Sequence, residues 1–582
     1  MTQAALSQPA PGAGPAPEAR TTARTRPLDP PLLPLAAAVP VAALAGVTLD
    51  GAFPALGWWP LAFVAVTLAL LTLVGRRAWG AVLAGAAFGA AFWFPHVSWS
   101  SRFLGDDPLG WVPWVALATA QTLFTAALSP LVTLAYRWLP RWRSTGVVRL
   151  AVLPLLVAGA WTTRELAMGS WPYGGFPWGR LGMSQSASPI APVASWLGVS
   201  GLSFCMVLLC AAVIEVVRVA RTTAPARADD VPVPARADDV PVPAGEDGAG
   251  AARRWRRWTA VLPATLPTAV PAVVLAVLLL VTPQFPTSHA GTLRVGAVQG
   301  NGPAAYSDER APGALLDAQL AASAPLADER VDLVVWPEGG VGSDPLADPA
   351  TERALDTAAR QYDAPLLVNA ASSKGELIYN TSFLWTEEGA TASHAKRHPV
   401  PFGEYVPDRW LYGAIVPSLV NLLGREYTPG TDVPAVDTGD AVVGLAICFD
   451  VVFDDVVREG IGNGAQAFMF QTNNADFRGT DENLQQTAFA RMRAVETGRA
   501  VVNLSTTGTS QVFAPDGTAG PALPADQAGL IVTDVELRDG VTAGVALGPW
   551  VQGLVVAGTV LALAGLAVQA RRSSRRKADT TD

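Results

Sequence analysis

Eight long apolar runs constrain this chain more than any other feature of its sequence. Each run is close to the roughly 20 residues that an α-helix needs to cross the hydrocarbon core of a bilayer. The runs cover residues 31–50, 56–74, 78–97, 111–137, 147–167, 193–219, 259–282 and 548–570. Charged residues make up only 15% of the 582-residue chain, against about 25% in a soluble protein. The sequence therefore predicts a polytopic α-helical membrane domain with eight transmembrane helices.

The basic residues divide the loops between these runs into two classes. Basic clusters lie in the N-terminal tail, in every second loop and after the last run, whereas loops such as 105–107 and 168–190 contain few bases. The clusters are Arg20–Arg26, Arg76-Arg77, Arg137–Arg149, Arg218–Arg257 and Arg571–Lys577. Because basic loops are retained in the cytoplasm, both termini are expected to be cytoplasmic. Residues 283–547 then lie on the extracytoplasmic side.

Low-complexity segments flank and interrupt the predicted helices. Between the sixth and seventh runs the unit PARADDVPV occurs twice in tandem, and its Pro, Ala and Asp content predicts a flexible linker. The adjacent patch Arg253–Trp258 is interpreted as a juxtamembrane anchor rather than a nucleic-acid site, because Trp favours the membrane interface and Arg binds phosphates. The predicted division begins with a disordered tail over 1–30, six membrane helices over 31–220 and a disordered linker over 221–258. A seventh helix over 259–282 leads to an outer domain over 283–547. An eighth helix over 548–570 and a basic tail over 571–582 end the chain.

The outer block, residues 283–547, has a different pattern from the rest of the chain. Short β-rich runs alternate with helical segments, which predicts an α/β domain with one extended core. The predicted strands are Leu293–Gln299, Leu333–Trp336, Leu366–Asn369, Ile378–Trp385, Val442–Cys448, Ala467–Gln471, Val501–Ser505 and Ile531–Val535. The predicted helices are 312–326, 351–361 and 483–497.

Several common kinds of site have no signal in this sequence. No Gly-rich phosphate loop follows a strand, and no Gly-x-Ser-x-Gly elbow is present. His394 and His398 are four residues apart, but Pro399 prevents a helix that would bring them together. Cys205 and Cys210 lie in one apolar run and are interpreted as core residues, so no disulfide framework is expected. We therefore expect no metal and no cofactor.

Three segments of the outer block carry residues suited to catalysis. Glu338 follows a strand in the segment WPEGG, and Cys448 closes the apolar run in GLAICFD. Lys396 is one of only three lysines in an arginine-rich chain, and Glu404 follows it by eight residues in a Pro-rich segment. Taken singly, these residues are more often a loop carboxylate, part of a basic surface loop or a core thiol than catalytic groups. Together they supply a base, a cation and a nucleophile, which cysteine-based acyl transfer requires.

The order and context of these segments resemble the Glu-Lys-Cys triad of the nitrilase/carbon–nitrogen hydrolase superfamily. The segment HPVPFGEYVP and the membrane frame are similar to the apolipoprotein N-acyltransferase family of that superfamily. Further matches are VQGN at 298–301, TNNA at 472–475 and the segment 486–499, and the resemblance extends from residue 31 to about 570. The arginine bias is typical of a GC-rich bacterial genome.

The resemblance implies a fold, a reaction and a set of roles. The fold would be an αββα sandwich on eight membrane helices, in the bacterial cytoplasmic (inner) membrane and acting as a monomer. Glu338 would be the general base, Lys396 the oxyanion and proton-transfer partner and Cys448 the nucleophile, with Glu404 supporting the lysine. A phospholipid would donate an acyl chain through a Cys thioester, and the N-terminal amine of a diacylated apolipoprotein would accept it.

The sequence departs from the family pattern beside two of these residues. Phe449-Asp450 replaces the usual Tyr-Glu after the cysteine, and His394-Ala395 replaces the usual Tyr-Asn before the lysine. These departures affect the neighbourhood of the site and leave the three expected catalytic residues in place. The aromatic outer segment 171–178 is expected either to line a lateral opening for lipids or to form part of an interfacial belt.

Two other functions are compatible with the residues alone. A membrane-anchored amidase or nitrilase would use the same triad on small amides, although eight helices exceed what an anchor needs. A transporter or receptor with an external binding domain would not need the thiol at all. A transporter would usually show intramembrane charges or internal repeats, whereas Glu165 and Glu215 lie near the ends of their runs.

Overall fold

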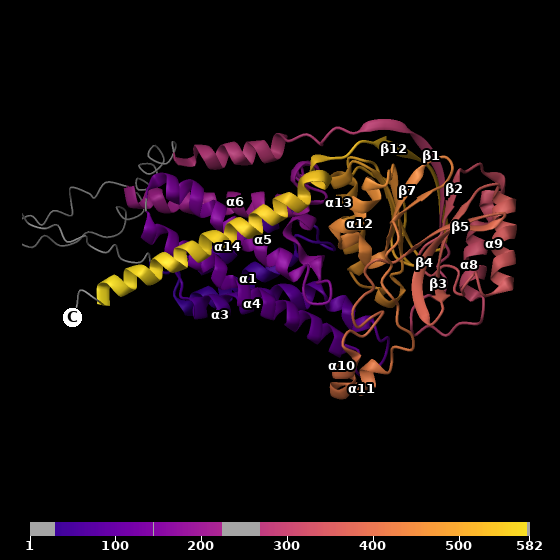
Figure 1. Ribbon diagram of the computed structural model, residues 1–582, viewed down its shortest axis with the longest axis horizontal. Helices are drawn as coiled ribbons and strands as arrows, with labels where there is room; N and C mark the ends of the chain where they lie inside the picture. The colour runs from indigo at the N-terminus through magenta and orange to yellow at the C-terminus, as the bar shows by residue number, and fades with distance from the viewer. Residues whose placement is uncertain (1–29, 144, 224–267, 579–582) are drawn as a thin grey trace, which may run out of the picture.

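The structure, a computed structural model, describes residues 30–143, 145–223 and 268–578. A bundle of long helices and an α/β domain follow one another along the long axis of the molecule (Figure 1). Nearly all of the predicted N-terminal tail, both PARADDVPV units and the last residues of the C-terminal tail lie outside the described residues.

A helix occupies each of the eight positions where the sequence predicts a membrane crossing. The helices are α1 (Leu35–Asp50), α2 (Leu61–Leu73), α3 (Ala78–His96), α4 (Trp111–Trp142), α5 (Leu153–Met168), α6 (Ala194–Thr223), the helix Thr268–Val281 and α14 (Ala543–Ala578). Among the described residues, five helical segments are long and apolar enough to cross a membrane: α3, α4, Val148–Met168, α6 and α14. The other three are shorter, so the structure confirms a helical region with five candidate membrane helices, and the count of eight remains a prediction.

Small residues allow the first helices of the bundle to approach one another closely. Gly85 on α3 faces Ser129 on α4, and a Cβ at Gly85 would lie only 2.2 Å from the Ser129 hydroxyl. Gly46 on α1 is equally close to the backbone of α3. Because lipid tails are as apolar as leucine, close packing of this kind is a main source of helix association in a membrane.

The α/β domain contains two six-stranded sheets. The strand order is β12-β1-β2-β3-β4-β5 in the first sheet and β11-β10-β9-β8-β7-β6 in the second. The first sheet is formed by β1 (Ser288–Gln299), β2 (Leu333–Val335), β3 (Leu366–Lys374), β4 (Leu377–Thr386), β5 (Gly389–Ala395) and β12 (Gly529–Asp539). The second is formed by β6 (Ala435–Asp437), β7 (Val442–Ile447), β8 (Ala467–Thr472), β9 (Ala500–Ser505), β10 (Ser510–Phe513) and β11 (Ala519–Leu523). In each sheet three neighbouring strands run parallel: β1, β2 and β3 in the first sheet, and β7, β8 and β9 in the second.

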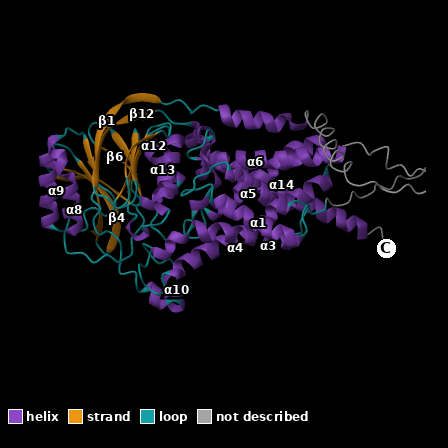
Figure 2. Ribbon diagram, turned by 180° about the vertical axis from the view of Figure 1, so that it is seen from behind, coloured by secondary structure: helices purple, strands orange, loops and turns teal. Residues whose placement is uncertain are grey.

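The two sheets pack face to face and are covered on both outer faces by helices. Leu293 and Leu333 of the first sheet share one buried cluster with Leu445 and Met469 of the second. The first sheet is covered by α8 (Ala314–Ser323) and α9 (Pro349–Tyr362). The second is covered by α12 (Asp454–Gly462) and α13 (Glu482–Thr497), which lie between that sheet and the helix bundle (Figures 1 and 2). The predicted α/β sandwich is therefore confirmed.

Every strand and helix predicted in the outer block is present, with shifted ends. The strand predicted at Leu366–Asn369 continues to Lys374, and the one predicted at Ile531–Val535 covers Gly529–Asp539. The sequence did not predict β5, β6, β10 and β11, or the helices α10 (Arg409–Ile415), α11 (Pro417–Val420) and α12. Most of these elements are short or lie at a sheet edge, where a strand has no regular apolar pattern.

The buried contact between the sheets makes a prediction about stability. Leu445→Ala opens a cavity between the sheets and should lower the free energy of unfolding by about 2–5 kcal/mol. Leu346→Ala is the matched control, because Leu346 is 64% exposed and its truncation should cost about 0.5 kcal/mol or less. Thermal unfolding of the purified variants in detergent measures both. Equal melting temperatures for the two variants would contradict the described core.

Candidate active site

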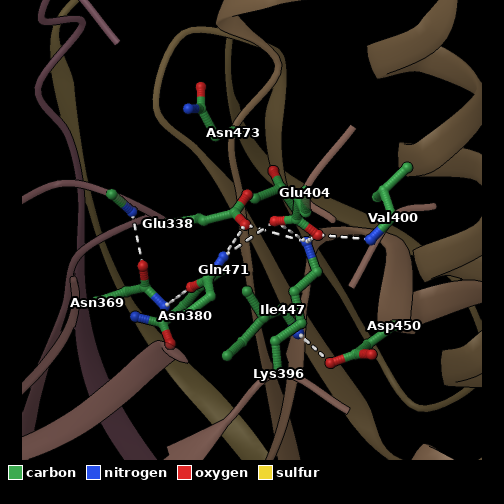
Figure 3. Close-up of polar contacts among 12 residues, drawn as sticks. Glu338, Asn369, Asn380, Lys396, Val400, Glu404, Ile447, Asp450, Gln471 and Asn473 are labelled. Atoms are coloured by element: carbon green, nitrogen blue, oxygen red, sulfur yellow. Dashed lines mark hydrogen bonds and ion pairs between the residues drawn. The ribbon is translucent and has the colours of Figure 1, made fainter. Parts of the chain in front are cut away.

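The three predicted catalytic residues all follow the carboxyl ends of strands. Glu338 lies in the loop after β2, Lys396 directly after β5 and Cys448 directly after β7. The first two strands belong to one sheet and β7 to the other, so the site lies between the sheets. Figure 3 shows Glu338 and Lys396 pointing toward each other, with Glu404 beside both.

Lys396 is the centre of the polar contacts at this site. Its side chain is 1% exposed, and its Nζ donates to Glu338 Oε1 at 3.2 Å and to the Glu404 carboxylate at 2.9 Å. The other Glu404 oxygen accepts the backbone N–H of Val400 at 2.7 Å, which fixes this carboxylate within its Pro-rich loop. The structure thus brings together the predicted base, the predicted cation and the predicted supporting glutamate.

Burial and charge shift the pKa values of Glu338 and Lys396. Burial raises the pKa of Glu338, and the negative charge of Glu404 raises it further, while Lys396 opposes both. For Lys396, burial favours the neutral amine, but the charges of Glu338 and Glu404 outweigh it and raise the pKa well above its usual range. These shifts favour the charged form of Lys396 and make Glu338 a stronger base than a carboxylate in water.

Cys448 occupies a sharp turn at the end of its strand. It begins the short helix Cys448–Val452 with φ of 50°, a left-handed backbone conformation that non-glycine residues rarely adopt. The residue is half-buried. Burial and the charge of Glu338 raise the pKa of the thiol well above its ordinary value, against an opposing effect of Lys396. At neutral pH the thiol is protonated, so its use as a nucleophile requires a group that takes the proton.

Asp450 connects the cysteine turn to the lysine loop. It is fully buried, and its carboxylate accepts the backbone N–H groups of Ile447, Arg397 and His398 at 3.3, 3.2 and 2.8 Å. No role is predicted for this residue from the sequence. In the structure it connects the backbone that follows Lys396 to the strand end that precedes Cys448.

Two asparagines that the sequence analysis did not identify orient Glu338. Asn380 on β4 donates to Glu338 Oε1 at 2.7 Å, and Asn369 on β3 donates to Asn380 Oδ1 at 2.9 Å. The oxygen of Asn369 accepts the N–H of Gly339 at 2.7 Å, which closes the network (Figure 3). The available signal in the sequence was an asparagine inside each of two predicted strands. A polar side chain that is buried in a strand needs hydrogen-bond partners.

A further acidic residue, Glu482, is buried near the site. It begins α13, is 2% exposed, and accepts the Asn474 side-chain N–H at 2.6 Å. Burial, with the nearby charge of Glu338, raises the pKa of Glu482 to about 8 despite this hydrogen bond. The sequence analysis placed Glu482 just outside a predicted helix and gave it no role.

Residues of the loop between α5 and α6 contact the site from the side of the helix bundle. The ring of Phe449, next to Cys448, stacks on Phe176 and Trp178 with centroid distances of 5.8 and 6.1 Å. Tyr173 donates a hydrogen bond to Asp408 at 2.8 Å. The aromatic segment 171–178, which the sequence links to lipid access or an interfacial belt, thus lies directly against the cysteine turn.

The two histidines near Lys396 point to different partners. His394 Nδ1 is 3.3 Å from Asp432, and His398 Nε2 is 2.9 Å from Asp455. In the part of the chain that the structure describes, no group of three or more His, Cys, Asp or Glu side chains is arranged to hold a metal ion.

Comparisons with known proteins match both halves of the chain. The family model for the apolipoprotein N-acyltransferase N-terminal domain matches residues 45–212, and the carbon-nitrogen hydrolase model matches residues 294–543. An apolipoprotein N-acyltransferase of Mycolicibacterium smegmatis is 31% identical over 567 residues, which cover 92% of this chain and 87% of that protein. One of Azotobacter vinelandii is 27% identical over 534 residues, with 89% and 92% covered. Among solved structures, the chain is similar to the crystal structure of Saccharomyces cerevisiae Nit3, a member of branch 10 of the nitrilase superfamily. The two sequences are 20% identical, the TM-score is 0.33, and the match covers 43% of this chain and 91% of that one.

The raised pKa of Glu482 predicts a pH dependence of stability. The folded protein holds a proton on Glu482 up to about pH 8, whereas the unfolded chain releases it near the ordinary glutamate value. Stability should therefore fall as pH rises from about 5 to about 8. Glu482→Gln should remove up to roughly 1 kcal/mol per pH unit of this loss. Melting temperatures across this range test it, with the exposed Glu376→Gln as control. A Glu482→Gln curve parallel to that of the wild type would contradict the assignment.

Proposed function

The chain belongs to the apolipoprotein N-acyltransferase family, and on that premise we propose that Glu338, Lys396 and Cys448 carry out its acyl transfer. The observation that carries the proposal is the buried Lys396 held between two carboxylates, beside a cysteine on a strained turn.

In the first step, Cys448 attacks the ester carbonyl of a membrane phospholipid. Glu338 takes the thiol proton while the C–S bond forms, and the Lys396 ammonium stabilises the negative charge that develops on the carbonyl oxygen. The C–O bond of the ester then breaks, and Glu338 returns the proton to the leaving oxygen. The products are a thioester on Cys448 and a lysophospholipid.

In the second step, the N-terminal amine of a diacylglyceryl-cysteine apolipoprotein attacks the thioester. A C–N bond forms and the C–S bond breaks, while Glu338 takes a proton from the amine and passes it to the Cys448 sulfur, which regenerates the thiol. The raised pKa of Glu338 suits it to both proton transfers, because a general base works best when its pKa is near the operating pH. Glu404 keeps Lys396 charged and in place through both steps.

The position of the site supports lipid substrates. The cysteine turn contacts aromatic residues that follow α5, and α10 exposes Trp410 and Ile415 at 78% and 63% beside the helix bundle. We propose that all eight apolar helices cross the inner membrane, with both termini cytoplasmic and the α/β domain outside. Both lipids would then reach Cys448 from the outer leaflet through the aromatic segment 171–178.

The two other functions suggested by the residues lack this support. An amidase that uses its helices only as an anchor does not account for the family match over residues 45–212. A transporter or receptor does not account for the hydrolase match over residues 294–543.

Trapping of the acyl-enzyme tests the proposal. Purified protein mixed with a phospholipid labelled in its acyl chains should gain one acyl group on Cys448, detectable by mass spectrometry and released by hydroxylamine. Cys448→Ala should gain none and lose at least about 10³-fold of the N-acylation rate. Cys205→Ala is the matched control, since Cys205 lies in α6, and it should behave like the wild type. Acyl-enzyme on Cys448→Ala, or full activity without the thiol, would overturn the proposal.

A further inference from the structure

A buried cluster of charged side chains joins the α/β domain to the helix bundle. Arg180 lies in the loop between α5 and α6, Asp454 begins α12, and Arg493 and Glu496 lie on α13. Arg180, Arg493 and Glu496 are 5%, 0% and 4% exposed. Burying a charged group destabilises a fold unless the group is paired, so these four side chains must keep their contacts with one another in the folded protein.

The carboxylate of Asp454 is the common acceptor of the cluster. Arg180 donates to both of its oxygens, at 2.7 and 2.8 Å, in the two-pronged geometry that suits a guanidinium. Arg493 adds a hydrogen bond at 2.8 Å, and Gln552 on α14 adds another at 2.8 Å. One side chain thus connects an outer loop of the bundle, the last membrane helix and the helices that cover the second sheet.

The same cluster holds the turn that carries Cys448. Arg493 donates from Nε to the carbonyl oxygen of Val451 at 2.7 Å, and Asp454 begins the helix that follows this turn. At the other end of the turn, Phe449 stacks on Trp178, two residues before Arg180 in the same loop. The loop between α5 and α6 therefore contacts the cysteine turn at both ends, through Trp178 at Phe449 and through Arg180 at Asp454. Cys448 has φ of 50°, a conformation that persists only where the surroundings impose it.

The roles of the two arginines differ in a way that an experiment can use. Without Arg180, Asp454 keeps Arg493 and Gln552, so no charge is left buried without a partner. Without Asp454, the positive charges of Arg180 and Arg493 would lie side by side without the carboxylate that they share. This loss would lower the stability of the fold. Substitution of Arg180 thus removes the link between loop and turn with the smallest effect on stability.

We propose that the Arg180–Asp454 ion pair positions the Cys448 turn against the membrane domain, and so controls how the thiol meets an acyl donor held in the bilayer. The inference rests on the proposed role of Cys448 as the nucleophile. Arg180 is a positioning residue, since it acts through the turn and touches neither the thiol nor the base. The pair should therefore affect reaction with a lipid donor far more than the chemical reactivity of the thiol.

The test compares two acyl donors on the Arg180→Gln variant. The first is phosphatidylethanolamine with labelled acyl chains in vesicles that contain the purified protein, and the second is water-soluble p-nitrophenyl butyrate. We expect the rate of Cys448 acylation by the phospholipid to fall about 100-fold, the loss typical of a misplaced reacting group. Acylation by the soluble ester should be nearly unchanged.

Two further variants serve as controls. Arg180→Lys keeps the charge but loses the two-pronged geometry, so its loss with phospholipid should be intermediate. Arg499→Gln removes an equally buried arginine, 3% exposed, that donates to the carbonyls of Ala465 and Gly540 within or next to the α/β domain. It should affect both donors alike. If Arg180→Gln does not fold, Arg180→Lys with the same two donors decides the question.

Two results would overturn the inference. One is an unchanged rate with phospholipid in the Arg180 variants. The other is an equal loss of acylation rate with both donors. That result would mean that the Arg180–Asp454 ion pair affects the reactivity of the thiol or the stability of the protein. Failure of the proposed function has a different signature, because the wild-type protein itself would then gain no acyl group on Cys448 from the phospholipid.

Discussion

The buried ammonium of Lys396 is the constraint on which the rest of the site depends. A lysine that is 1% exposed would destabilise the fold by several kcal/mol without partners. Glu338 and Glu404 supply these partners, and Asn380 binds Glu338 in turn. Because the lysine binds both carboxylates within hydrogen-bond distance, the loops after β2 and β5 have little freedom to move. The geometry of the proposed site is thus a consequence of pairing one buried charge.

From that centre, polar contacts extend across the two sheets and into the bundle. Gln471 of the second sheet donates to the carbonyl of Trp336 at 2.6 Å, just before Glu338 in the first sheet. Asp450 holds the backbone of the lysine loop and of the cysteine turn together. On the other side of that turn, Phe449 meets the aromatic segment 171–178. The αββα arrangement and the helix bundle therefore set the position of one thiol between them, which suits an enzyme whose donor is a lipid.

The signals for the fold class and for the proposed site are local in the sequence. Glu338 and Cys448 each follow an apolar strand, and Lys396 precedes a Pro-rich segment. The missed features depend on contacts distant in sequence. Arg180 and Asp454 are separated by 274 positions, and nothing in either neighbourhood predicts their pairing. The strand Gly389–Ala395 was missed because GATASHA contains small and polar residues without an apolar alternation. Asn380 and Glu482 acquire their roles only through burial.

The most direct test of the central claim follows the acyl group through a single turnover. Wild-type protein is first loaded with a labelled acyl chain from phospholipid, freed of excess lipid, and then mixed with a synthetic diacylglyceryl-cysteine peptide. The account predicts that label leaves Cys448 at the same rate as it appears as an amide on the peptide amine. Amide that forms while the label on Cys448 stays constant would contradict a thioester intermediate and with it the proposed role of the Glu338, Lys396 and Cys448 site.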